Sequence, residues 1–227
     1  MANNVLKVNS IAIADIAKIN GQDDSDLAKL NGEEFTGVTD DHVLIATRTV
    51  PADESAPVSS IDFESGIDST YDVYEFIVSS LHPSADAAKL RWRSSTTTSG
   101  TFSYGVTTST VFYQTYNHET SGSTNLSYAA GLDAAASSSD DIYLTDGVGF
   151  DDDQTASGRV QLFNPSNTTF TKHFITEIQQ SSAGNTCNCS RTAGHITTTT
   201  AITGVQFSFS SGNINSGVIK MFGYNLS

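Results

Sequence analysis

The chain has 227 residues and a mass of 24.1 kDa, enough for one medium-sized domain with its own core and too little for a multidomain machine. It carries 25 acidic and 11 basic residues, and the net charge of −14 has the wrong sign for binding a nucleic-acid backbone. The 31 serines and 28 threonines outnumber the helix-forming charged residues, so the composition predicts an all-β domain.

Membrane insertion and secretion are also not expected. The sequence lacks any run of about 18 apolar residues, and its N-terminus lacks the charged and apolar regions of a secretory signal. The two cysteines, Cys187 and Cys189, lie in a Ser/Asn/Thr-rich stretch that we predict as a loop. A bridge between them would close a strained ring, so we expect free thiols and synthesis in a reducing cytosol.

The charges are divided unevenly along the chain. Residues 1–157 hold 24 acidic and 7 basic residues, a net charge of −17, whereas residues 158–227 have a net charge of +3. Segments of opposite sign could attract each other within a subunit or between subunits. The alternative interpretation is that acidic loops precede a buried, nearly neutral sheet.

Residues 1–35 are predicted to form an anchoring arm that contains an internal repeat. Residues 16–21 read Ile-Ala-Lys-Ile-Asn-Gly, and residues 27–32, which follow 11 positions later, read Leu-Ala-Lys-Leu-Asn-Gly. In each copy a capping residue precedes one apolar turn, and Asn-Gly can end a helix, so we expect an extended arm with two short helical turns.

Single helical turns are unstable alone, so the arm must dock onto another surface. That surface belongs either to a neighbouring subunit or to the chain's own sandwich, and the first alternative is favoured. The residues predicted to anchor the arm are its apolar ones, namely Val5, Val8, Ile11, Ile13, Ile16, Ile19, Leu27 and Leu30.

Residues 36–70 are predicted to be an acidic connection that contains the first strands, at 42–49 and 60–63. From residue 71 onward the pattern has period two: Leu90 and Trp92 alternate with arginines, which places Trp92 in the core. About eight to ten strands without helices between them predict a jelly-roll β-sandwich over residues 71–227. The strands predicted in this region are 74–79, 90–93, 102–107, 111–116, 141–145, 159–163, 169–178, 195–200, 205–209 and 218–222.

Six aspartates crowd residues 140–153, on a segment that also contains glycine. Hard oxygen ligands on a flexible loop suit calcium, and the candidate ligands are Asp146, Asp151 and Asp153. The spacing is not that of an EF-hand, and no glutamate follows to close the loop. A solvated acidic loop is therefore the favoured interpretation, and we expect no cofactor other than this calcium candidate.

The residues of a catalytic site are not apparent in the sequence. Five histidines stand among 31 serines, so a chance triad is easy to find, but no Gly-x-Ser-x-Gly motif occurs. The carboxylates expected within strands lie on separate strands, with no spacing that predicts the convergent pair of a glycosidase. These are Asp72, Glu75, Asp141 and Glu177.

Carbohydrate binding without catalysis is a separate candidate activity. The loops at the edge of a sandwich can present tyrosine and asparagine side chains to a sugar, and one aromatic stretch of this sequence has that composition. The candidate ligand-binding residues are Tyr113, Tyr116, Asn117 and Tyr128.

Two stretches resemble structural proteins of tailed bacteriophages, particularly marine and cyanobacterial phages. The first is Ile-Ala-Asp-Ile-Ala-Lys-Ile-Asn-Gly at residues 13–21 with its second copy, which resembles repeats that precede globular domains in such proteins. The second is the sandwich, including Tyr-Asp-Val-Tyr-Glu-Phe at 71–76 and the closing segment at 212–224. Together they cover most of the chain, and they are patterns of packing and turns that carry no catalytic residues.

The resemblance implies a non-enzymatic structural component of the virion, located in the tail, a fibre or the surface decoration, with tail or fibre favoured. Its partners would be other virion proteins, and a homotrimer is favoured by family analogy. The alternative is a module on the virion surface that binds a host glycan or receptor.

Overall fold

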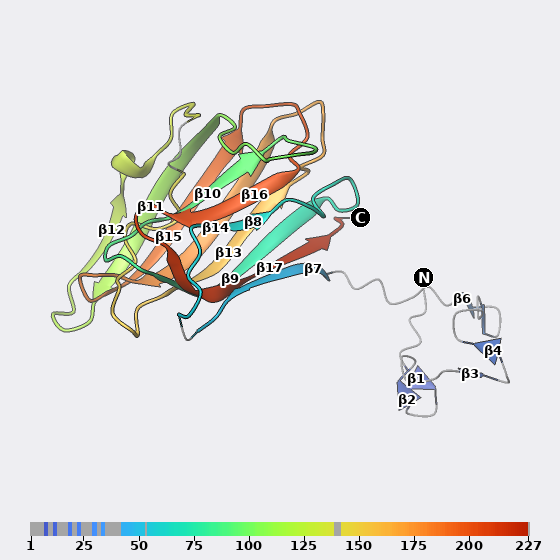
Figure 1. Ribbon diagram of the computed structural model, residues 1–227, viewed down its shortest axis with the longest axis horizontal. Helices are drawn as coiled ribbons and strands as arrows, with labels where there is room; N and C mark the ends of the chain where they lie inside the picture. The colour runs from blue at the N-terminus through green and yellow to red at the C-terminus, as the bar shows by residue number, and fades with distance from the viewer. Residues whose placement is uncertain are drawn as a thin grey trace. The chain divides into compact units, whose positions relative to one another are not determined.

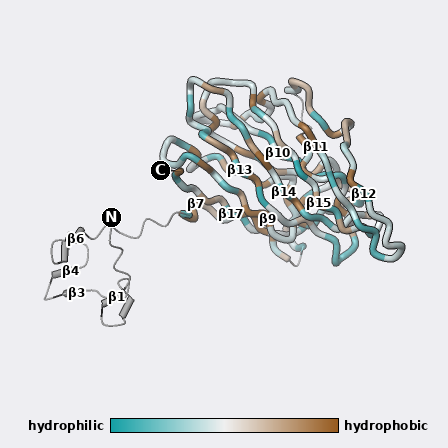
Figure 2. The backbone as a smooth tube through the Cα atoms, turned by 180° about the vertical axis from the view of Figure 1, so that it is seen from behind, coloured by the Kyte–Doolittle hydropathy of each residue, from teal (hydrophilic) through white to brown (hydrophobic). Residues whose placement is uncertain are grey.

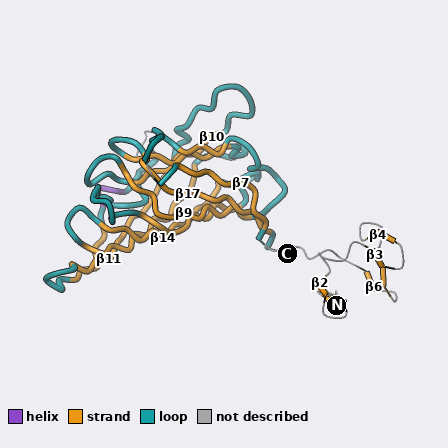
Figure 3. Tube along the Cα trace, turned by 60° about the horizontal axis from the view of Figure 1, so that its bottom comes forward, coloured by secondary structure: helices purple, strands orange, loops and turns teal. Residues whose placement is uncertain are grey.

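The computed structural model describes residues 42–52, 54–138 and 142–226, together with six two-residue strands between residues 7 and 34. The chain divides into two compact units, Met1–Asp41 and His42–Ser227. The described part of the second unit consists of strands and loops, apart from the short 3-10 helix η3 (Ala130–Leu132) (Figure 3). The prediction of an all-β chain is therefore confirmed. Among the described residues, no helix has the length and apolar character needed to cross a membrane.

The second unit is built from two antiparallel sheets that face each other (Figure 1). The larger sheet has eight strands in the order β12-β11-β15-β14-β13-β9-β17-β7, and the smaller has three in the order β10-β16-β8. The strands are β7 (Val43–Val50), β8 (Ile61–Phe63), β9 (Val73–Pro83), β10 (Leu90–Ser95), β11 (Thr108–His118), β12 (Thr124–Tyr128), β13 (Ala156–Phe163), β14 (Lys172–Ser181), β15 (Thr186–Ile196), β16 (Gly204–Phe209) and β17 (Ile214–Tyr224).

This arrangement supports a β-sandwich, whereas the jelly-roll topology is not confirmed. The segment 36–70, predicted as an acidic connection with first strands at 42–49 and 60–63, contains β7 and β8 close to those positions. β7 forms one edge of the larger sheet and β8 one edge of the smaller. The described residues of the second unit contain eleven strands, slightly more than the predicted eight to ten.

Several predicted strand positions are wrong. Residues 102–107 form no strand. In the strand predicted at 141–145, the described residues form no strand, and Tyr143 makes an isolated bridge with Arg91. The strand predicted at 195–200 instead spans Thr186–Ile196, so both cysteines lie in β15 rather than in a loop; they are free thiols, as predicted. The buried positions of β15 include Asn188, Ser190 and Thr192. Because these inward-facing residues are polar, this part of the strand lacks the alternation of apolar and polar residues by which strands are predicted.

Large apolar residues on the facing sides of the two sheets form the core. Hydrophobic positions alternate with hydrophilic ones along the strands (Figure 2). Phe63 from the smaller sheet packs against Phe76 of β9 at 5.2 Å between ring centroids, and Phe207 of β16 lies 5.5 Å from Phe76. Trp92 is buried as predicted and meets Phe174 of β14 at 4.7 Å. These aromatic contacts join the two sheets.

Tyr74, a buried residue of β9, makes the stability of the fold sensitive to alkaline pH. Its hydroxyl donates to the carbonyl oxygen of Asp68 at 3.1 Å and accepts from the Asp68 backbone N–H at 3.0 Å. Burial raises the pKa of Tyr74 from 10.0 to about 12. Between these values the unfolded chain releases a proton that the native chain keeps, so the free energy of unfolding falls as pH rises.

We expect this tyrosine alone to remove about 2–3 kcal/mol of stability between pH 9 and pH 12. Urea unfolding midpoints measured across that range test the expectation. Tyr74→Phe should be less stable at neutral pH and should lose less stability on going to alkaline pH. Burial also raises the pKa values of Tyr104 and Tyr224, so part of the fall in the free energy of unfolding with rising pH should remain in this variant. An identical slope in Tyr74→Phe would show that Tyr74 does not contribute.

The first unit contains three short antiparallel strand pairs instead of the two predicted helical turns, which are not confirmed. The pairs are β1 (Lys7–Val8) with β2 (Ile11–Ala12), β3 (Lys18–Ile19) with β4 (Gln22–Asp23), and β5 (Lys29–Leu30) with β6 (Glu33–Glu34). Equivalent strands follow each other at 11-residue intervals, so the repeat has three copies.

The sequence between the paired strands explains the difference. It is Asn-Ser in the first copy and Asn-Gly in the other two. Asn-Gly can end a helix, but it is also the strongest short signal for a two-residue hairpin turn. Of the predicted anchor residues, Val8, Ile11, Ile19 and Leu30 belong to these strands, whereas Val5, Ile13, Ile16 and Leu27 lie outside the described residues.

Candidate functional site

A shallow hollow lies on the outer face of the eight-stranded sheet, the side turned away from β10, β16 and β8. Strands β11, β13, β14 and β15 supply its residues. Because side chains alternate along each strand, Thr176 and Thr192 are buried while their neighbours Glu177 and Arg191 turn outward. The residues that line the hollow are Tyr113, Arg159, Gln161, Ile175, Thr176, Glu177, Arg191, Thr192 and Ala193.

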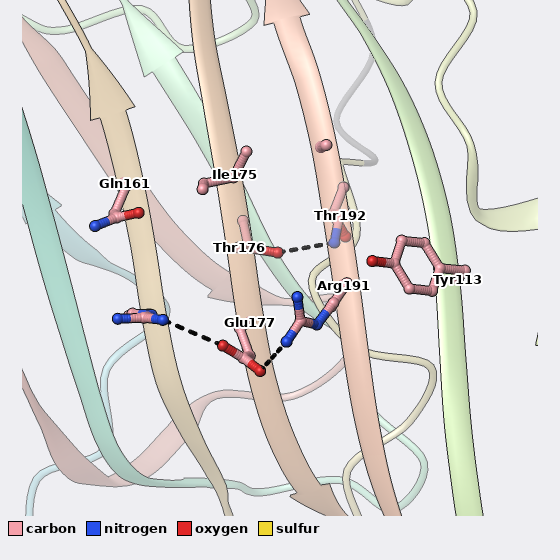
Figure 4. A pocket seen from close by; sticks show the side chains of 9 residues that line it. Tyr113, Gln161, Ile175, Thr176, Glu177, Arg191 and Thr192 are labelled. Carbon is pink, nitrogen blue, oxygen red and sulfur yellow. Dashed lines mark hydrogen bonds and ion pairs between the residues drawn. The ribbon is translucent and has the colours of Figure 1, made fainter. Parts of the chain in front are cut away.

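Two arginines flank one glutamate in this hollow (Figure 4). Strand register places Arg159 of β13 opposite Glu177 of β14, and an Nη2 of Arg159 lies 3.4 Å from Glu177 Oε2. Arg191 of β15 donates to the other carboxylate oxygen. The Glu177 carboxylate raises the pKa of Arg191 further above its ordinary value. All three groups are in contact with solvent, so the cluster contributes little to stability and leaves a local excess of positive charge.

A second polar group continues from this hollow across the same face. The Gln161 amide donates to Glu75 Oε1 and to the Tyr224 hydroxyl, each at 3.0 Å. His42 Nε2 lies 3.0 Å from the other oxygen of Glu75, and its ring meets that of Tyr224 edge-on. Burial, followed by the charge of Glu75, raises the pKa of Tyr224. The polar contacts therefore extend from β15 to the strands at the other side of the sheet.

Apolar side chains are exposed beside these charged groups. Val111 is 49% exposed, Ile175 is 47% exposed and Tyr113 is 41% exposed. Arginine and tyrosine next to exposed aliphatic residues are typical of protein-binding surfaces, where these residue types carry much of the binding energy. The arrangement suits recognition of another macromolecule.

The structure separates the predicted ligand-binding residues. Tyr113 and Tyr128 are paired across β11 and β12 on the outer face, where the Tyr128 hydroxyl donates to Asp133. Asn117 is exposed further along β11. Tyr116 instead lines a second hollow, together with Gln114. The four residues therefore do not form one site.

The candidate calcium ligands are also not brought together. Asp146 lines the second hollow, whereas Asp151 lies in a turn in which its carbonyl oxygen accepts from the backbone N–H of Gln154 at 2.8 Å. Asp153 is an exposed residue of that turn. In the parts of the chain that the structure describes, no three histidine, cysteine, aspartate or glutamate side chains are grouped as metal ligands.

The sequence interpretation missed the Arg159–Glu177–Arg191 cluster. Glu177 is 18 residues from Arg159 and 14 residues from Arg191 in the sequence. The three side chains meet only through the register of three strands. The residue types gave one weak signal, since Glu177 is the single acidic residue of the otherwise basic segment 158–227.

Comparisons of the chain with protein-family models, with curated proteins and with solved structures found no match.

Proposed function

We propose that this chain is a non-enzymatic structural component of a tailed-phage virion, attached to neighbouring subunits through residues 1–35. The observation that carries the proposal is the arm with its three equivalent strand pairs, which forms a unit separate from the sandwich. A single two-stranded hairpin is at best marginally stable in water, so three of them in series gain order by docking. Equal spacing suits a partner that offers equivalent docking sites.

The sandwich supports the same proposal. It has its own aromatic core, and its outer face presents arginines, tyrosines and exposed aliphatic residues of the kind found at subunit contacts. A rigid block joined to its neighbours by a separate arm suits a tail, fibre or surface component of the particle. A trimer remains the expected oligomer, by analogy with phage fibres.

Removing the arm should separate folding from assembly. A chain that lacks residues 1–32 should keep a cooperative thermal transition, because the sandwich core begins at Val50, and should be lost from purified particles. Mass spectrometry of particles from cells that produce the variant measures incorporation. A chain in which a Gly/Ser segment of equal length replaces residues 1–32 controls for length. Incorporation of the truncated chain at the wild-type level would rule out the anchoring role.

The second candidate function is a glycan- or receptor-binding module on the virion surface. The cross-strand pair of Tyr113 and Tyr128 favours it, because both rings are exposed on the outer face and Tyr113 lies opposite Arg191 of β15. A glycan array that compares the wild type with Tyr113→Ala tests this second role. Loss of signal in the variant supports it, and an array without any signal contradicts it.

A further inference from the structure

The second hollow lies where β11 ends and β15 begins, and the segment that contains Asp146 and Gly147 forms part of its wall. Its volume is about 320 Å³. The polar residues that line it are Gln114, Tyr116, Asp146, Ser182, Thr186 and Asn188, and glycine and alanine complete its wall. No lysine, arginine or histidine is among the described residues of this lining. We name it the Asp146 hollow.

Two amide side chains of the hollow have buried oxygens without a hydrogen-bond donor. Gln114 is 7% exposed and Asn188 is 6% exposed. The Gln114 Nε2 donates to Asp146 Oδ2 at 2.8 Å, which fixes the orientation of the amide and leaves its Oε1 unpartnered. The Oδ1 of Asn188 is likewise buried without a partner. Buried carbonyl oxygens are ordinarily hydrogen-bonded, so both oxygens have an unused capacity to accept a hydrogen bond.

Two further buried acceptors lie next to these residues on the inner face of the sheet. Gln180 is paired with Asn188 across β14 and β15, and its Nε2 donates to the Gly147 carbonyl oxygen at 3.3 Å while its Oε1 has no partner. Ser190, which is paired with Gln114, also has an unpartnered hydroxyl oxygen. Unpartnered acceptors therefore occur both in the lining of the hollow and directly beside it, and Asp146 adds one carboxylate to the lining.

We propose that the Asp146 hollow binds an uncharged saccharide. Sugar hydroxyls can donate to the free oxygens of Gln114 and Asn188 and to the Asp146 carboxylate, and they can accept from the hydroxyls of Tyr116 and Thr186. The lining has no cation to attract an anionic ligand, and the partly exposed ring of Tyr116 adds an apolar surface of the kind that packs against a sugar.

A divalent cation fits the hollow less well. Calcium takes six to eight oxygen ligands, usually with several carboxylates, and here Asp146 is the one carboxylate among the described lining residues. One of its oxygens already accepts from Gln114. The hollow is also larger than a single ion requires.

The saccharide proposal concerns the sandwich and does not depend on the virion role. The test uses the purified full chain with glucose, galactose, mannose and N-acetylglucosamine as probes, and it records saturation-transfer NMR signals during titration. We expect saturable binding of at least one of these sugars. Asp146→Ala should weaken that binding about tenfold or more, because it removes a charged acceptor.

Gln114→Met distinguishes a loss of sugar binding from a loss of folding stability. It removes the unpartnered oxygen and the donor to Asp146, whose exposed carboxylate water can satisfy, while keeping the side-chain length. The thermal midpoint should therefore stay the same or rise while sugar binding is lost. Thr115→Ala, an exposed position on the opposite face of the same strand, is the matched control and should bind as the wild type does.

Three results would overturn the proposal: no binding of any of the four sugars, sugar binding that Gln114→Met retains, or a response to calcium chloride without one to sugars. None of them bears on whether the arm anchors the chain, which particle incorporation measures.

Discussion

Trp92→Ala should destabilise the sandwich by about 3–5 kcal/mol, the range for a large aromatic residue removed from a packed core. Trp92 is 1% exposed and lies on β10 of the smaller sheet, with its ring 4.7 Å from that of Phe174 on the larger sheet. The other strands of the small sheet cannot close the resulting cavity, because β16 is already held between β10 and β8. Urea unfolding followed by far-UV circular dichroism measures the loss, since the substitution removes the chain's single tryptophan.

Trp92→Phe should cost much less, about 1–2 kcal/mol, for a reason specific to this site. The indole Nε1 is buried without a hydrogen-bond partner, so its replacement also removes an unsatisfied donor. Phe170→Ala is the control for loss of an aromatic side chain at the surface, because Phe170 is 68% exposed, and it should change stability by less than about 0.5 kcal/mol. A Trp92→Ala loss no larger than that of Phe170→Ala would contradict the contact between the sheets.

The contrast between Trp92 and strand β15 shows which features of this fold can be predicted from sequence. Trp92 stands between two arginines, so period-two alternation assigns it to the core. Apart from Ile196 at its end, the buried residues of β15 are asparagine, serine and threonine, and the outward residues include both cysteines, so polarity does not distinguish the two faces along most of the strand. The strand is specified by its pairing with β14, which directly precedes it, and with β11, which lies far upstream in the sequence.

The same limit applies to the candidate sites. The candidate list contained Tyr116 and Asp146 but assigned them to different ligands, a sugar and calcium, whereas the structure places them in one hollow. Gln114 and Asn188 could not be identified beforehand, since an unpartnered oxygen becomes visible only when its surroundings are known. The prediction of helical turns in the arm was not confirmed for a local reason, because the sequence Asn-Gly is compatible both with the end of a helix and with a hairpin turn.

Gly217→Ala should destabilise the sandwich by about 2–5 kcal/mol, since backbone strain and steric overlap add at this position. Gly217 has φ of +127°, which side chains rarely allow, and it follows a register shift between β17 and β9. A Cβ atom there would lie 2.7 Å from the Ser80 carbonyl oxygen and 2.8 Å from Leu81 Cα. Both neighbours are backbone atoms of β9, and β17 is held between β9 and β7, so neither strand can move aside cheaply.

Gly100→Ala isolates the conformational part of this cost. Gly100 has φ of +80° in a loop, and no atom lies within 4 Å of the position its Cβ would take. The substitution should therefore cost only about 1 kcal/mol. Urea midpoints of the two variants, compared at equal m-values, give the difference that is due to contact with β9. Equal losses would mean that β9 and β17 do not approach closely at the bulge, whereas a larger loss for Gly217→Ala ties the last strand of the chain to the centre of the large sheet.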